Sequence, residues 1–202
     1  MKKICFIEIG CNCNLSLLLQ NSDLKLNIYN SPFKWTLCHD LQKSVIEPIK
    51  AKFDKFIDTI PDKKFKTEGN VTYVNKYNVH FPHEKTLKIS ENEFIICKEE
   101  IHKRYNRRIE RFYNIFKEAD DVYLLRSTID FYDNNFKIFN NKTCDVINLN
   151  ELKLLQELCN ILKEQTNNNN IYSFYFNKEK DWRDFVFFVN NNKDNIIYAN
   201  FL

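Results

Sequence analysis

The chain has 202 residues, of which 44% are hydrophobic and 15% aromatic, so it can bury a sizeable core and is not disordered over most of its length. Thirty Lys and Arg against 27 Asp and Glu leave a net charge of +3, which is too small to indicate nucleic acid as the main ligand. The two glycines, Gly10 and Gly69, are too few for a dinucleotide-binding loop or a P-loop, because both need several glycines.

Seven cysteines are present, an odd number that favours free thiols in a reducing compartment over a framework of disulfides. Residues 1–13 have the basic start of a signal peptide, but their apolar stretch is short and includes Glu8. No run of about eighteen apolar residues exists, so no membrane-spanning helix is predicted. We therefore expect a cytoplasmic protein.

The first half of the chain is predicted to start with a strand and a helix. Residues 3–9 are apolar and β-branched, which predicts a buried strand that ends at Gly10. Leucines at helical spacing predict a short helix that opens near residues 12–14. Apolar residues spaced by three or four predict a second helix over residues 40–57. Residues 71–82 alternate between apolar and polar types, as in a strand or a hairpin.

The longest predicted helix follows Ser90-x-x-Glu93, a capping box that satisfies backbone N–H groups at a helix start. Apolar residues then recur at helical spacing from Phe94 to Phe116. The remaining predicted elements are a strand at 122–126, a short strand within 136–147, a helix at 152–162, a strand at 171–176 and a helix at 182–189.

This order of helices and strands favours an α/β fold, a single domain over residues 1–202 with a mixed, mostly parallel sheet flanked by helices. In such sheets, binding sites form beyond the carboxyl ends of the strands. Residues 10–13 and 126–130 follow two predicted strands in this way. They are therefore the segments in which we expect functional side chains.

Cys13 is the main candidate nucleophile. It follows a strand and a turn glycine and falls at a predicted helix start, where backbone N–H groups and the helix dipole stabilise a thiolate. Free N–H groups of the same turn, with the Asn12 amide, are suited to hold an oxyanion. The alternative interpretation is a buried structural thiol, the commonest role of cysteine.

A nucleophilic cysteine needs a base, and His83, at the end of a predicted strand, is the best placed of four histidines. His39, His80 and His102 are interpreted as capping or surface histidines. No zinc site is expected, because the cysteines do not form two CxxC pairs at the spacing of a zinc finger. No other cofactor is expected either.

Arg126 ends an apolar strand, where a charged side chain is costly unless it is paired. It is expected either to pair with an acid such as Asp130 or Glu8 or to bind a substrate anion. Arg126 and Gly10 are therefore the candidate substrate-binding residues. The basic run at residues 103–111 is interpreted as a solvated helix face, because glutamates dilute it.

Several segments together resemble a family of proteins from bacteria and large DNA viruses described as papain-like cysteine peptidases. The resemblance covers roughly residues 3–127. In chain order, the segments are IEIGCNC, SPFKW, YNVHFPHE, NRRIERF and VYLLR.

The resemblance implies that Cys13 is the nucleophile and His83 its histidine partner, in the cytoplasm of a bacterium or of the host of a virus. The family commonly has Asp after this histidine, where this chain has Glu84. Glu84, Asp130 and Asn12 therefore all remain candidates for the group that orients the base. The family's description also implies a papain-like α+β core, as an alternative to the α/β fold.

The sequence thus predicts a thiol hydrolase that acts on a peptide, an isopeptide or a related acyl group such as a thioester, with a protein as one possible substrate. An acyltransferase would use the same Cys and His apparatus with another acceptor. A non-catalytic binding module that keeps the fold is the alternative from a different class. Neither a membrane nor nucleic acid is expected as a partner, and the oligomeric state is left open.

Overall fold

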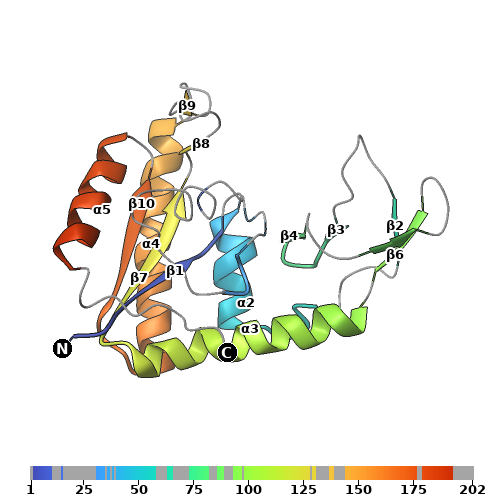
Figure 1. Ribbon diagram of the computed structural model, residues 1–202. Coiled ribbons are helices and arrows are strands. Elements are labelled where there is room, and N and C mark those ends of the chain that lie inside the picture. Colours follow the sequence, from blue (N-terminus) through green and yellow to red (C-terminus); the bar gives the residue numbers. More distant parts are fainter. Residues whose placement is uncertain are drawn as a thin grey trace.

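The computed structural model describes residues 2–10, 15, 31–34, 36, 38, 40–57, 63–65, 73–81, 86–88, 93–96, 98–127, 129–130, 137–138, 144–176 and 179–192. In this part of the chain, the central sheet has three strands, β1 (Ile4–Glu8), β7 (Asp121–Ser127) and β10 (Ile171–Phe176) (Figure 1). Strand β7 lies between the other two and pairs with both in parallel. This sheet and the helices around it confirm the α/β prediction.

Helices cover both faces of the parallel sheet. Helix α3 (Lys98–Glu118) precedes β7, α4 (Cys144–Thr166) precedes β10, and α5 (Glu179–Asn191) follows it. In Figure 1, α5 lies to one side of the sheet and α3 runs along its lower end. Every residue of β1 is buried, as expected for a strand of a sheet that is covered on two sides.

Successive side chains of β1 enter two different hydrophobic clusters. Ile4 and Phe6 pack with α5, where the rings of Phe6 and Phe185 meet edge to face with centroids 5.4 Å apart. Cys5 and Ile7 face the larger cluster, which includes residues of α3 and α4. Side chains of an extended strand alternate between the two faces of a sheet. A shift of one residue would move each side chain to the wrong face, so this alternation fixes the register of β1.

The helix predicted over residues 40–57 is shorter than expected. A π-helical segment, η1 (Gln42–Ile46), continues into α2 (Glu47–Lys50), and residues 51–57 form turns instead of a helix. Lys52, Phe53 and Lys55 have positive φ angles, which a right-handed helix does not allow. The rings of Phe53 and Phe56 nevertheless stay in the core, so the apolar spacing reports burial here rather than helix.

Three small antiparallel sheets complete the described elements. Strand β6 (Glu93–Ile96) lies between β2 (Lys63–Phe65) and β5 (Thr86–Lys88). Figure 1 shows β2 and β6 beyond the N-terminal end of α3, away from the parallel sheet. The predicted hairpin is confirmed as β3 (Tyr73–Val74) with β4 (His80–Phe81). Past the end of β7, β8 (Ile129–Asp130) pairs with β9 (Lys137–Ile138).

The capping box at Ser90 and Glu93 does not start the long helix, so that prediction is wrong. Glu93 begins strand β6, and α3 begins at Lys98. The segment Glu93–Ile96 contains a phenylalanine and two isoleucines, which fit a strand, and it pairs with strands on both sides. Tertiary pairing therefore overrides the local helix signal.

Among the described helices, none combines eighteen or more residues with enough apolar character to cross a membrane. The prediction of one domain over residues 1–202 stays a prediction.

Candidate functional site

The candidate site lies at the carboxyl edge of the parallel sheet, beyond β1 and β7. The backbone N–H of Ile9 donates to the carbonyl oxygen of Leu125 at 3.1 Å. Backbone pairing with β7 therefore continues one residue past the end of β1. Gly10 follows Ile9, and Arg126 follows Leu125. The two residues named from the sequence as candidate substrate-binding residues therefore lie at the same edge.

Gly10 has a backbone conformation and surroundings that suit glycine. Its φ angle is +65°, in the left-handed region that other residues rarely adopt. A β-carbon at this position would lie 3.2 Å from Cys38 Sγ and 3.2 Å from the carbonyl oxygen of Phe33. The chain therefore turns at Gly10 while packed directly against the 31–38 segment.

Ser31 ties the 31–38 segment to the end of β1. Its hydroxyl donates to the carbonyl oxygen of Glu8 at 2.6 Å and accepts the backbone N–H of Phe33 at 3.2 Å. The hydroxyl of Thr36 donates to the carbonyl oxygen of Phe33 at 2.6 Å. These bonds hold the described residues of the segment in a turn against Gly10.

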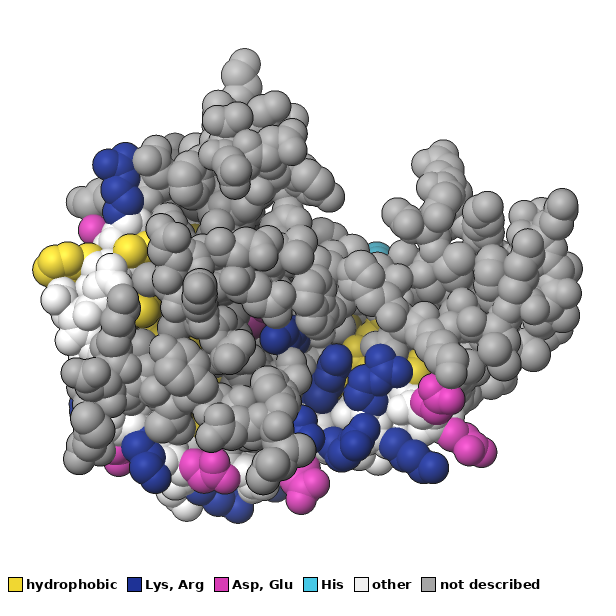
Figure 2. Space-filling model, in the orientation of Figure 1, with side chains coloured by type: hydrophobic (Ala, Val, Ile, Leu, Met, Phe, Trp, Pro, Cys, Tyr) yellow, Lys and Arg dark blue, Asp and Glu magenta, His cyan; other side chains and the backbone are white. Residues whose placement is uncertain are grey.

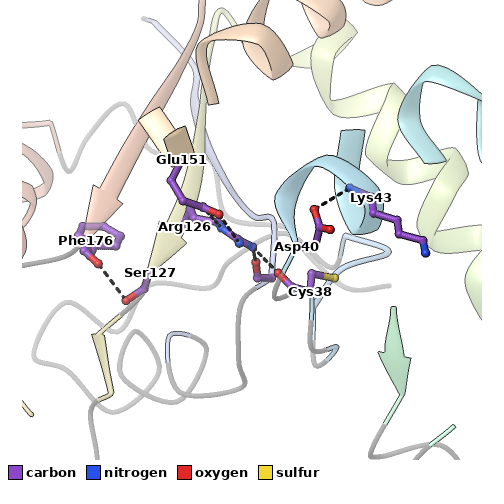
Figure 3. A network of polar contacts seen from close by, with 8 residues as sticks. Cys38, Asp40, Lys43, Arg126, Ser127, Glu151 and Phe176 are labelled. Carbon is purple, nitrogen blue, oxygen red and sulfur yellow. Dashed lines mark hydrogen bonds and ion pairs between the residues drawn. The ribbon is translucent and has the colours of Figure 1, made fainter. Parts of the chain in front are cut away.

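Arg126 joins the site to helix α4 (Figure 3). Its side chain is 1% exposed, and its Nε donates to Glu151 Oε2 at 2.8 Å. Nη2 donates to the other carboxylate oxygen at 3.2 Å, so the guanidinium and the carboxylate meet as two forks. Nη1 donates to the carbonyl oxygen of Cys38 at 2.7 Å and also to that of Gly10.

The sequence prediction that Arg126 ends a strand and pairs with an acid is confirmed. Arg126 lies at the carboxyl edge of the sheet and pairs with an acid, as expected. One acid that it binds is Glu151 of α4, which no sequence motif indicates, and pairing with Asp130 or Glu8 stays a prediction. Asp130 lies in β8, and its side chain is outside the described residues. Direct contact of Arg126 with substrate stays a prediction.

The 31–38 segment also brings a lysine into the interior, near the buried Glu8. Lys34 is only 6% exposed, and burial lowers the pKa of its ammonium group, while the nearby Glu8 carboxylate raises that pKa and Arg108 lowers it. Arg108 also donates to the carbonyl oxygen of Lys34 at 3.4 Å and lies over the ring of Tyr105. One arginine of the basic run 103–111 therefore has a structural contact next to the candidate site.

The surface formed by α3 carries many of the visible charges. Figure 2 shows dark blue Lys and Arg side chains gathered over this helix, with magenta acidic side chains beside them. A cavity of about 310 Å³ lies between α3 and the turns at residues 51–57, and His102 and Asn106 line its helical side. Among the described residues, no three His, Cys, Asp or Glu side chains are grouped as a metal site would require.

Four of the predicted catalytic residues, Asn12, Cys13, His83 and Glu84, lie outside the described residues. Their described neighbours in the chain are informative. Leu15 is helical and buried in the cluster on the α5 face of the sheet. Phe81 ends strand β4 and is buried in the larger cluster.

Comparison with known proteins gave one match. The sequence model of a family described as "Putative papain-like cysteine peptidase (DUF1796)" matches residues 4–174. The match covers β1, β7, α4 and β10 as far as residue 174, and it therefore includes Gly10, Arg126 and Glu151. No curated protein and no solved structure matches the chain at a significant level.

Proposed function

Because the chain belongs to the papain-like cysteine peptidase family DUF1796, we propose that it is a thiol hydrolase with Cys13 as its nucleophile. The observation that carries this proposal is the short connection from Gly10, at the carboxyl edge of the sheet, to Leu15, which is helical. Cys13 lies within that connection. The sequence predicts a helix start at residues 12–14, and a nucleophile at such a start has access both to a substrate and to free backbone N–H groups.

Chain geometry limits how far Cys13 can be from the described site. Consecutive Cα atoms of a trans chain are about 3.8 Å apart, so Cys13 lies within about 11 Å of Gly10 and about 8 Å of Leu15. Gly10 is bonded to Arg126, and Leu15 packs on the sheet. The described residues that flank Cys13 in the sequence are therefore both fixed to the sheet.

A series of contacts through buried aromatic residues connects Gly10 with Phe81, which precedes His83 in the sequence. The carbonyl oxygen of Phe33 lies against Gly10, and the rings of Phe33 and Phe56 are 6.2 Å apart. The ring of Phe56 is in turn 6.0 Å from that of Phe81, which precedes His83 by two residues. This chain of contacts supports a pairing of His83 with Cys13, although the two lie far apart in the sequence.

The proposed reaction follows from these roles. His83 takes the proton of the Cys13 thiol, and the thiolate attacks a carbonyl carbon while backbone N–H groups near Asn12 hold the oxyanion. His83 then gives the proton to the leaving group, and water releases the acid from the thioester. Glu84, Asp130 and Asn12 remain the candidates for orienting His83. The substrate is a peptide, an isopeptide or a thioester.

The proposal is tested by the pH dependence of Cys13 alkylation with iodoacetamide, followed residue by residue by mass spectrometry. A thiolate stabilised by a helix start and by an imidazolium has a pKa below the free value of about 8.5, so Cys13 should still react fast at about pH 6. His83→Ala should return the profile to that of a free thiol. His80→Ala and His102→Ala are the matched controls and should not change it.

Activity on a panel of peptide, isopeptide and thioester substrates completes the test. Cys13→Ala and His83→Ala should each lower the rate on any accepted substrate by about 10² or more. A Cys13 that titrates like a free thiol, or that ignores the loss of His83, would contradict the proposal. That result would favour the non-catalytic binding module.

A further inference from the structure

We propose that Arg126 and Glu151 are positioning residues of the thiol site, which hold the chain in place where it leaves β1 towards Cys13. This inference rests on the proposed function. It concerns an ion pair of the described residues, and neither the sequence motifs nor the family match gives Glu151 a role.

The contacts of Arg126 connect three parts of the chain that are distant in sequence. Two nitrogens of its guanidinium bind both carboxylate oxygens of Glu151, on α4. The third nitrogen binds the carbonyl oxygens of Gly10 and Cys38. Figure 3 shows the guanidinium lying between Glu151 and Cys38. The side chain therefore acts as a bridge from a helix to two loops.

These contacts restrict the direction in which the chain leaves Gly10. A peptide unit is planar, so a hydrogen bond to the carbonyl oxygen of Gly10 fixes the orientation of the peptide that follows. Cys38 Sγ and the Phe33 carbonyl oxygen also lie against Gly10, at the place where a β-carbon would stand. A catalytic group has to be held within about 0.5 Å of its productive position, and these contacts restrain the residue from which the Cys13 segment begins.

Glu151 is needed because it orients the guanidinium. A planar guanidinium bound by both carboxylate oxygens cannot rotate, so its remaining nitrogen points at the two carbonyl groups. At 1% exposure, Arg126 has little surface through which to touch a substrate. Burial and geometry therefore favour positioning over direct binding.

The test is the pH dependence of Cys13 alkylation in the Glu151→Gln and Arg126→Lys variants. Glu151→Gln keeps the shape but removes the charge, and Arg126→Lys keeps the charge but removes the fork. Both should lower the alkylation rate of Cys13 at about pH 6 by about tenfold or more, by shifting the profile towards that of a free thiol. Glu151→Asp, which keeps a carboxylate, should restore part of the rate.

Two controls on α4 separate positioning from a general loss of stability. Glu157→Gln removes the acid of the exposed pair with Lys50 and should leave the profile unchanged. Leu162→Ala destabilises the core about 16 Å along the helix from Glu151 and should lower the thermal midpoint without changing the profile. Circular dichroism shows which chains remain folded at the assay temperature.

The two proposals fail in different ways. If Cys13 of the unaltered chain titrates like a free thiol, the proposed function fails, and the positioning role fails with it. If the unaltered chain has a lowered Cys13 pKa that persists in folded Glu151→Gln or Arg126→Lys chains, the positioning role alone is overturned. The same holds if Leu162→Ala shifts the profile as much as these two variants do.

Discussion

Cys38 and Gly10 lie in such close contact that the Sγ atom of Cys38 is 3.2 Å from the place of a β-carbon on Gly10. The carbonyl oxygen of Phe33 lies at the same distance, and it is backbone, which cannot rotate away as a side chain can. The left-handed φ of Gly10 adds a second, independent restriction. The carboxyl end of β1 is therefore a position at which both space and conformation require glycine.

Gly10→Ala should lower the free energy of unfolding by about 1–3 kcal/mol, because alanine meets both restrictions. Urea denaturation measures this loss. In a double-mutant cycle with Cys38→Ala, the loss in the double variant should be smaller than the sum of the two single losses by about 0.5–1 kcal/mol. The reason is that removal of Sγ relieves one of the two contacts. A Gly10→Ala chain within about 0.5 kcal/mol of the unaltered chain would argue against this geometry.

Removal of Glu151 should be much more costly than removal of Glu157, although both are glutamates of α4 paired with a cation. Glu151→Ala leaves the guanidinium of Arg126 buried without this carboxylate, which typically costs about 3–5 kcal/mol. Glu157→Ala breaks a pair whose side chains are 42% and 49% exposed, and it should cost less than about 1 kcal/mol. Equal losses in urea denaturation would show that the Arg126 pair is open to solvent.

Alkaline pH should destabilise the protein through two partly buried tyrosines. Burial raises the pKa of Tyr113 to about 12 and that of Tyr123 to about 12, from the ordinary value of about 10. Between these values the unfolded chain binds fewer protons than the folded chain, so the free energy of unfolding falls as pH rises. Below about pH 10 this contribution is fully present.

Urea denaturation at a series of pH values measures this effect. Tyr123→Phe and Tyr113→Phe should each make the decline between about pH 10 and 12 shallower, and the double variant should have the shallowest decline. An unchanged decline in the double variant would assign the alkaline loss of stability to other groups.

The parallel sheet could be predicted because its strands are short runs rich in apolar and aromatic residues, and β1 in particular is buried on both faces. Strand β1, strand β10 and helix α5 all fall on their predicted segments. The small sheet of β2, β5 and β6 could not be predicted in the same way. Its strands are short, and each depends on partners distant in sequence, whereas the capping box at Ser90 is a purely local signal.

The candidate site was predictable where it depends on the ends of strands. Gly10 and Arg126 were found from the rule that sites form beyond the carboxyl ends of parallel strands. Glu151 was not found, because helix periodicity does not tell which strand a helix will cover. The burial of Lys34 was also missed, since a lysine between two aromatic residues gives no sequence signal that it will enter the core.

The buried cysteines should be the least reactive thiols of the folded protein. Burial raises the pKa of the Cys5 and Cys159 thiols, so little thiolate is present at neutral pH. Iodoacetamide must also wait for the structure to open, and each 1.4 kcal/mol of opening free energy slows the reaction about tenfold. At about pH 7 we expect both residues to react at least about 10² times more slowly than in urea.

The slow reaction expected for Cys5 and Cys159 is the internal reference for Cys13, because the alkylation of all thiols is measured in one digest. If Cys13 is the nucleophile, it should react faster in the folded protein than in urea, the reverse of Cys5 and Cys159. A structural thiol would react more slowly after folding, as we expect for Cys5 and Cys159. Cys13→Ser identifies its peptide by the loss of the fast signal. Fast labelling of Cys5 or Cys159 in the folded chain would contradict the burial of β1 or α4, on which the location of the site depends.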